Sequence, residues 1–172
     1  MILDTVRMVA DWLNDATYGV NAVLAAVDLD GTDSAPAGTY TIQDETRDDD
    51  AAINRDGTPP LIRVTSGDLR SLDGQSATYT HDADISTEIT IVRDATSPAA
   101  VVRDCYYTAR AVAKSVESLF GTSATAATAR VRNGVQAYAI TNLSTAAIRV
   151  DEGDRPATLT VFLTVRVRDL NA

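Results

Sequence analysis

Apolar residues recur at helical spacing near the start of the chain. A three- and four-residue spacing predicts an amphipathic helix over 2–15, with its apolar stripe at Ile2, Val6, Val9 and Leu13. The pattern breaks at Gly19. It then resumes over 21–27, which predicts a second, short helix with Asn21 as a candidate cap.

The longest helical pattern lies in the second half of the chain. Ser97 occupies a cap position, Pro98 the first helical position, and Gly121 the stop. Between them runs a wide apolar stripe, formed by Val102, Cys105, Tyr106, Ala109, Val112, Ala113, Val116, Leu119 and Phe120. This segment predicts a long helix packed on the core by one face.

Alternation of apolar and polar residues predicts strands elsewhere. The predicted strands are 61–66, 76–82, 85–94, 134–140, 143–150 and 157–168. Residues 67–75 are rich in turn formers, and 122–130 predict a mobile loop or weak edge. The order of elements predicts an α+β fold, with a mostly antiparallel sheet of about four to six strands covered by two main helices. A single domain over 1–172 is expected.

Residues 28–60 differ in character from the rest of the chain. They hold nine acidic residues and three prolines, and only Tyr40 and Ile42 suggest a strand. We interpret this segment as an extended acidic arm or loop, of a length that is usually either functional or disordered.

The net charge of −9 argues against a surface that grips nucleic acid, which needs clustered Lys and Arg. The basic residues are 14 arginines and one lysine. A single cysteine rules out a disulfide within the chain, and a single histidine disfavours a His-built metal site. We see neither a membrane-spanning run nor a signal peptide, and expect no cofactor.

One short motif suggests an enzyme. "VDLDGTD" resembles the first motif of haloacid-dehalogenase-like phosphatases, with Asp28 as nucleophile, Asp30 as acid/base and Mg²⁺ as cofactor. That family places the motif after a strand, whereas "VNAVLAAV" here has helical spacing. The only lysine, Lys114, also follows the late acidic motif instead of preceding it. A turn at Asp30-Gly31 explains the same residues.

Other reactive or metal-binding arrangements have weaker support. A calcium loop counted from Asp28 would need Glu at its twelfth position, where Thr39 stands. Cys105 lies on the apolar stripe and is expected to be a buried, inert thiol, while His81 is expected in a solvated turn. We therefore predict that the protein is not an enzyme.

Two sets of charged residues are candidates for interactions. The acidic run is either a solvated loop or a surface facing DNA or a basic partner, and the arginines either aid solubility or pair with acids of a neighbouring subunit. The candidates are Asp44, Glu45, Asp48, Asp49, Asp50, Arg149, Arg155, Arg166 and Arg168.

The layout of the whole chain resembles tail terminator proteins of long-tailed bacteriophages. The features that carry the resemblance are the opening "MILDTVRMVADWL", then "AAVDLDGTD" and a proline-containing arm leading into "PLIRV", the helix "SPAAVVRDCYYTARAVAKSVESL", and the final strand "RPATLTVFLTVRV". Head-completion or connector proteins of the phage neck are the alternative.

The resemblance implies a structural virion protein, assembled in the host cytoplasm. It would form a ring, usually a hexamer, at the head-proximal end of the tail tube. The ring would stop tube growth and join the tail to the head connector, and DNA would pass through its lumen without specific binding. Self, tail tube protein and connector are the implied partners.

Overall fold

A computed structural model describes residues 1–26, 39–44, 60–72, 80–91, 98–150 and 157–170. The helices are α1 (Ile2–Leu13), α2 (Val20–Ala25), α3 (Pro98–Leu119) and α4 (Ala124–Ala129). The strands are β1 (Thr41–Asp44), β2 (Leu61–Ser71), β3 (Thr80–Ile91), β4 (Val131–Arg132), β5 (Val135–Thr145), β6 (Arg149–Val150) and β7 (Ala157–Asp169).

All the strands of the described residues belong to one sheet. Its order is β1-β2-β3-β7-β5-β4, and the short β6 pairs with β7 beyond the end of β5. Only β1 and β2 are parallel; the other neighbours are antiparallel. The predicted α+β class with a mostly antiparallel sheet is therefore confirmed.

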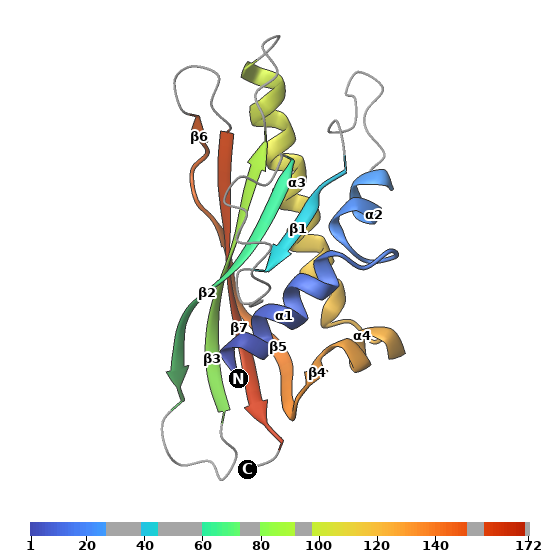
Figure 1. Ribbon diagram of the computed structural model, residues 1–172, viewed down its shortest axis with the longest axis vertical. Helices are drawn as coiled ribbons and strands as arrows, with labels where there is room; N and C mark the ends of the chain where they lie inside the picture. The colour runs from blue at the N-terminus through green and yellow to red at the C-terminus, as the bar shows by residue number, and fades with distance from the viewer. Residues whose placement is uncertain (27–38, 45–59, 73–79, 92–97, 151–156, 171–172) are drawn as a thin grey trace, which may run out of the picture.

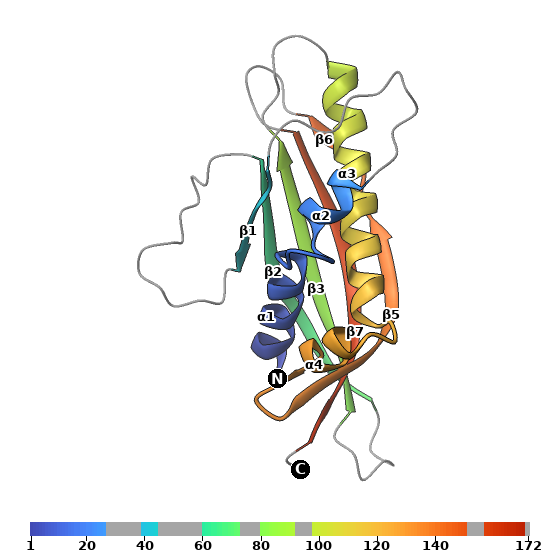
Figure 2. The same cartoon turned by 90° about the vertical axis from the view of Figure 1, so that its right-hand side faces the viewer.

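The molecule has two layers. In Figure 1 the helices lie to one side of the tall sheet, and Figure 2, turned by 90°, shows them in front of it. The two main helices, α1 and α3, cover the sheet as predicted, with α2 and α4 beside them. The opposite face of the sheet carries no helix among the described residues.

The core lies between the two layers. Ile85 and Ile89 of β3 and Leu163 of β7 are at most 1% exposed on the sheet side. From the helices, Leu13, Val112 and Val116 are fully buried against them. The period-two pattern of the strands and the stripes of both main helices thus meet in one apolar layer, except that Tyr106 of the predicted α3 stripe is 58% exposed.

Two polar contacts fasten the helical layer. The indole Nε1 of Trp12 donates to the Ser115 carbonyl oxygen at 2.8 Å, which ties α1 to α3. The Asn21 side chain donates to the Tyr40 carbonyl oxygen at 2.9 Å and accepts from the Tyr40 amide at 2.8 Å. Gly19 is the cap residue of α2, so Asn21 is no cap but holds the start of β1 instead.

Several predicted boundaries were wrong. Strand β2 continues through the expected turn, with an irregularity between Ser66 and Leu69. The supposed loop at 122–130 contains α4, whose cap Ser123 accepts a hydrogen bond from the Ala126 amide at 3.1 Å. Strands β4 and β5 form a hairpin through Asn133 and Gly134, whose positive φ angles of 49° and 78° suit a tight two-residue turn.

Candidate protein-interaction surface

The helix-free face of the sheet carries a row of charged and polar side chains. Along β3, the odd-numbered residues Ala83, Ile85 and Thr87 point into the core. The even-numbered residues therefore point the other way, because successive side chains of a strand alternate between faces. We call this surface the open face; its main members are Arg63, Arg70, Asp82, Asp84, Glu88, Phe162, Thr164, Arg166 and Arg168.

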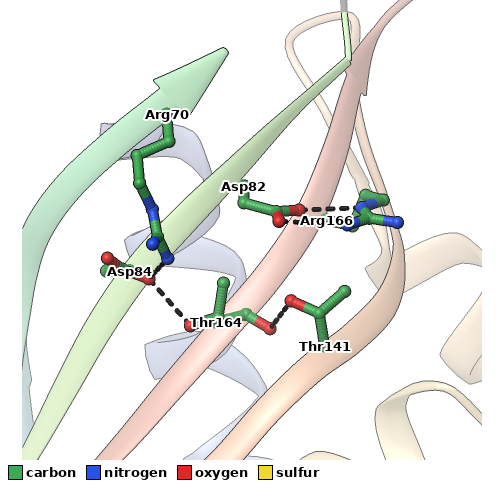
Figure 3. A network of polar contacts seen from close by, with 6 residues as sticks. All are labelled: Arg70, Asp82, Asp84, Thr141, Thr164 and Arg166. Atoms are coloured by element: carbon green, nitrogen blue, oxygen red, sulfur yellow. Dashed lines mark hydrogen bonds and ion pairs between the residues drawn. The ribbon is translucent and has the colours of Figure 1, made fainter. Parts of the chain in front are cut away.

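The best-defined ion pair of the open face joins the two central strands. Arg166 of β7 lies opposite Asp82 of β3. Its Nε donates to Oδ1 at 2.8 Å and its Nη2 to Oδ2 at 3.0 Å, a two-pronged contact (Figure 3). These hydrogen bonds lower the pKa of Asp82 and raise that of Arg166. The pair therefore keeps a fixed geometry and leaves little charge for an outside partner.

A second group of contacts centres on Asp84. Its Oδ1 accepts from the Nη2 of Arg70 at 2.8 Å and from the hydroxyl of Thr164 at 2.7 Å. The hydroxyl of Thr141 donates to the Thr164 carbonyl oxygen at 3.3 Å. Residues from β2, β3, β7 and β5 are thus linked across the sheet (Figure 3).

Further contacts of the same kind lie to either side. Arg63 of β2 approaches Glu88 of β3, with Nη1 and Oε1 3.6 Å apart. Arg168 donates from Nε to Gln136 Oε1 at 2.7 Å, and its guanidinium lies 5.9 Å from the centre of the Tyr138 ring. Each acid named on the open face therefore has an arginine within ion-pair distance.

Aromatic rings are exposed beside these charges. Phe162 is 43% exposed in the middle of β7, between Ser86 of β3 and Ser144 of β5 in the strand register. Tyr138 is 41% exposed on β5. An internally hydrogen-bonded surface that presents arginines and aromatic rings has the composition of a protein-protein interface.

The predicted interaction residues lie in different parts of the structure. Arg166 and Arg168 lie on the open face, where Arg166 pairs with Asp82 of its own chain. Arg149 is exposed on β6. The remaining candidates, Glu45, Asp48, Asp49, Asp50 and Arg155, lie outside the described residues.

Asp44 is not a surface charge. It ends β1, its side chain is only 3% exposed, and its Oδ2 lies 3.9 Å from Arg7 Nε of α1. The sequence placed Asp44 in an acidic surface run. A short strand instead carries it beneath α1, where its side chain packs within the fold of its own chain.

Two of the three acids named on the open face, Asp82 and Asp84, were missed as candidate residues. They sit in "THDADIS", where polar residues alternate with small or apolar ones. That alternation was the available signal that both carboxylates lie on one face. Their partners on β7, 80 and 84 residues away along the chain, could be found only with the strand register.

The phosphatase-like motif "VDLDGTD" follows a helix. Residues Val20–Ala25 form α2, as their spacing predicted, so no strand leads directly into Asp28. Asp28 and Asp30 themselves lie outside the described residues. The helix agrees with the turn interpretation of the motif, and it removes the strand context that the phosphatase interpretation needs.

Neither Cys105 nor His81 has the surroundings of a catalytic residue. Cys105 is fully buried on α3, as predicted, and burial raises the pKa of its thiol to about 11. His81 is not in a turn but within β3, where its Nδ1 is buried without a hydrogen-bond partner among the described residues.

A pocket of about 300 Å³ lies on the other side of the molecule, between α1, α4 and β4. Trp12, Met8 and Val131 line it, and the Asp11–Arg132 ion pair at 2.6 Å lies at its wall. Within the described ranges, no cluster of three or more His, Cys, Asp or Glu residues is suited to a metal ion. No helix there is long and apolar enough to span a bilayer.

Comparison with known proteins adds no relative to this picture. No protein-family model matches the chain, and no curated protein matches it significantly.

Proposed function

We propose that this protein is a structural component of a long-tailed phage virion, a tail terminator. It forms a ring at the head-proximal end of the tail tube, stops tube growth and joins the tail to the head connector. The resemblance of the whole chain to that family supports the proposal. The observation that supports it in the structure is the open face, on which Phe162 is exposed among cross-strand ion pairs.

The open face suits a protein partner better than DNA. Its named charges are four arginines against three acids, and each acid has an arginine partner. The surface is therefore nearly neutral, although the chain carries a net charge of −9. Pre-formed pairs keep their geometry on binding, so less conformational entropy is lost when a partner docks. We propose the tail tube protein as the partner of this face.

The test measures assembly and tube capping together. Light scattering and negative-stain imaging of the purified protein should show rings, and with tail tube protein these rings should cap tube ends. Phe162→Ala should leave rings intact but reduce capping at least tenfold, since exposed aromatic anchors dominate interface energies. Tyr106→Ala is the matched control, because Tyr106 is 58% exposed on α3, in the helical layer. A strict monomer that ignores tubes overturns the proposal.

A further inference from the structure

The free edge of β5 is unusual for an edge strand. Natural proteins protect such edges with charges, prolines or very short strands. Residues 133–148, which include all of β5, contain neither a charged residue nor a proline. In the described part of the chain, β4 pairs with β5 only through Val135 and Gln136. Among the described residues no strand pairs with the rest of the β5 edge, and Thr141, Asn142, Ser144 and Thr145 are exposed.

The regular part of this edge is short and well defined. Register irregularities fall between Ala137 and Ala139 and between Ile140 and Asn142. From Asn142 to Thr145 the pairing with β7 is regular. Two of these four residues therefore present their amide and carbonyl groups outward, because alternate residues of an antiparallel strand bond to opposite neighbours.

The other end of the same sheet offers a matching edge. Strand β1 is also four residues long, Thr41–Asp44, and within the described ranges it pairs only with β2. The strand directions also fit. Strand β5 runs antiparallel to β7, and following the order back through β3 and β2 makes β1 antiparallel to β5. When copies stand side by side in one orientation, β5 of one therefore meets β1 of the next in the antiparallel sense.

We infer that Asn142–Ser144 of one copy pairs with Thr41–Gln43 of a second copy, head to tail, and joins their sheets. The inference rests on the proposed ring, since a head-to-tail contact between two different surfaces is what closes a ring. The faces fix the register. Leu143 and Ile42 are both half-buried on the helix-covered side, as their partners Leu163 and Ile62 show, so they become neighbours. Ser144 then lies opposite Thr41 on the open-face side, and the open faces of successive subunits form one continuous surface.

Disulfide cross-linking tests the pairing directly. The double variant Thr41→Cys, Ser144→Cys should give an oxidised ladder of covalent oligomers that ends at the ring size. Native Cys105 is fully buried and will not contribute. The control is Thr41→Cys, Ala127→Cys, since Ala127 is exposed on α4, and it should give no ladder. Hydrogen exchange at Asn142–Thr145 should slow at least tenfold in the assembled protein relative to dilute monomer.

The outcomes separate this inference from the proposed function. Rings without a ladder and without added protection at Asn142–Thr145 overturn the pairing and leave the ring standing. Covalent dimers from Ser144→Cys alone would mean that β5 pairs with β5, which also overturns it. A protein that stays monomeric with and without tail tube protein overturns both proposals.

Discussion

The two faces of the sheet are stabilised by different physics. On the helix-covered face, side chains such as Ile85, Ile89 and Leu163 lose nearly all contact with water. Each such burial contributes about 1.5–3 kcal/mol. On the open face the same strands hold partly exposed ion pairs, which typically contribute about 0–1 kcal/mol each. The first face supplies most of the stability, while the second fixes the shape of a surface without adding much to it.

The sharpest test of this contrast uses two adjacent residues of β7. Leu163→Ala removes a side chain that is 1% exposed and should lower the free energy of unfolding by about 2–5 kcal/mol. Urea denaturation followed by circular dichroism measures this loss. If Leu163→Ala costs no more than the neighbouring Phe162→Ala, the assignment of the two faces is wrong.

A second variant tests whether the connection between α1 and α2 tolerates an added side chain. A Cβ atom on Gly19 would lie 2.3 Å from the Asp15 carbonyl oxygen and 2.5 Å from that of Leu13. Gly19→Ala must therefore displace the α1–α2 connection, and we expect a loss of about 1–3 kcal/mol in the same urea experiment. Gly121→Ala is the control, because its nearest backbone atom would be 3.0 Å away. Equal losses in both variants would contradict this account.

The third prediction concerns pH and the open face. Hydrogen bonds from Arg166 hold the pKa of Asp82 below its ordinary value of 3.8. The Asp82–Arg166 pair therefore stabilises the fold above pH 3.8, and this stabilisation is lost as pH falls through the lowered pKa of Asp82 in the folded protein. Asp82→Asn should cost roughly 1 kcal/mol at neutral pH and flatten the fall in stability below about pH 4. Unfolding at several pH values measures it, with the exposed Asp68→Asn as control. An unchanged acid slope in Asp82→Asn would show that the pair is not linked to stability.

The smallest effect on stability is expected at Phe162. Its ring is 43% exposed, so Phe162→Ala should change the free energy of unfolding by only about 1 kcal/mol or less. Its effect on capping should be far larger than its effect on the melting temperature. A large loss of stability would mean that the ring supports the fold and is not held ready for a partner.

Local patterns predicted the elements whose periodicity is uniform. Spacing alone predicted helices α1, α2 and α3 and strand β7, because the apolar residues of each element face the same buried layer. The pattern failed where local chemistry and tertiary pairing disagree. The residue types of Gly67 and Asp68 predicted a turn, yet both lie within β2, in an irregular stretch between two parts of the strand that pair with β3. Helix α4 was missed although its alanines and the Ser123 cap favour a helix.

The candidate surface was only partly predictable. The sequence singled out Arg166 and Arg168, but it could not show that Asp82 lies opposite Arg166, since strand register joins residues 84 positions apart. It also placed Asp44 at the surface. The contact that buries this residue comes from Arg7 on α1, a helix that no local pattern near Asp44 reveals.

The position of β7 has a consequence for how the protein folds. It is the last of the strands in chain order, yet it lies at the centre of the sheet between β3 and β5. Until β7 is synthesised, no strand joins β1-β2-β3 to β4-β5. The chain segment between the paired strands β3 and β7 also contains the whole of α3. Such long-range pairing makes folding slow. The nascent chain therefore exposes two unjoined half-sheets until its synthesis reaches β7, and this is the stage at which a chaperone would matter most.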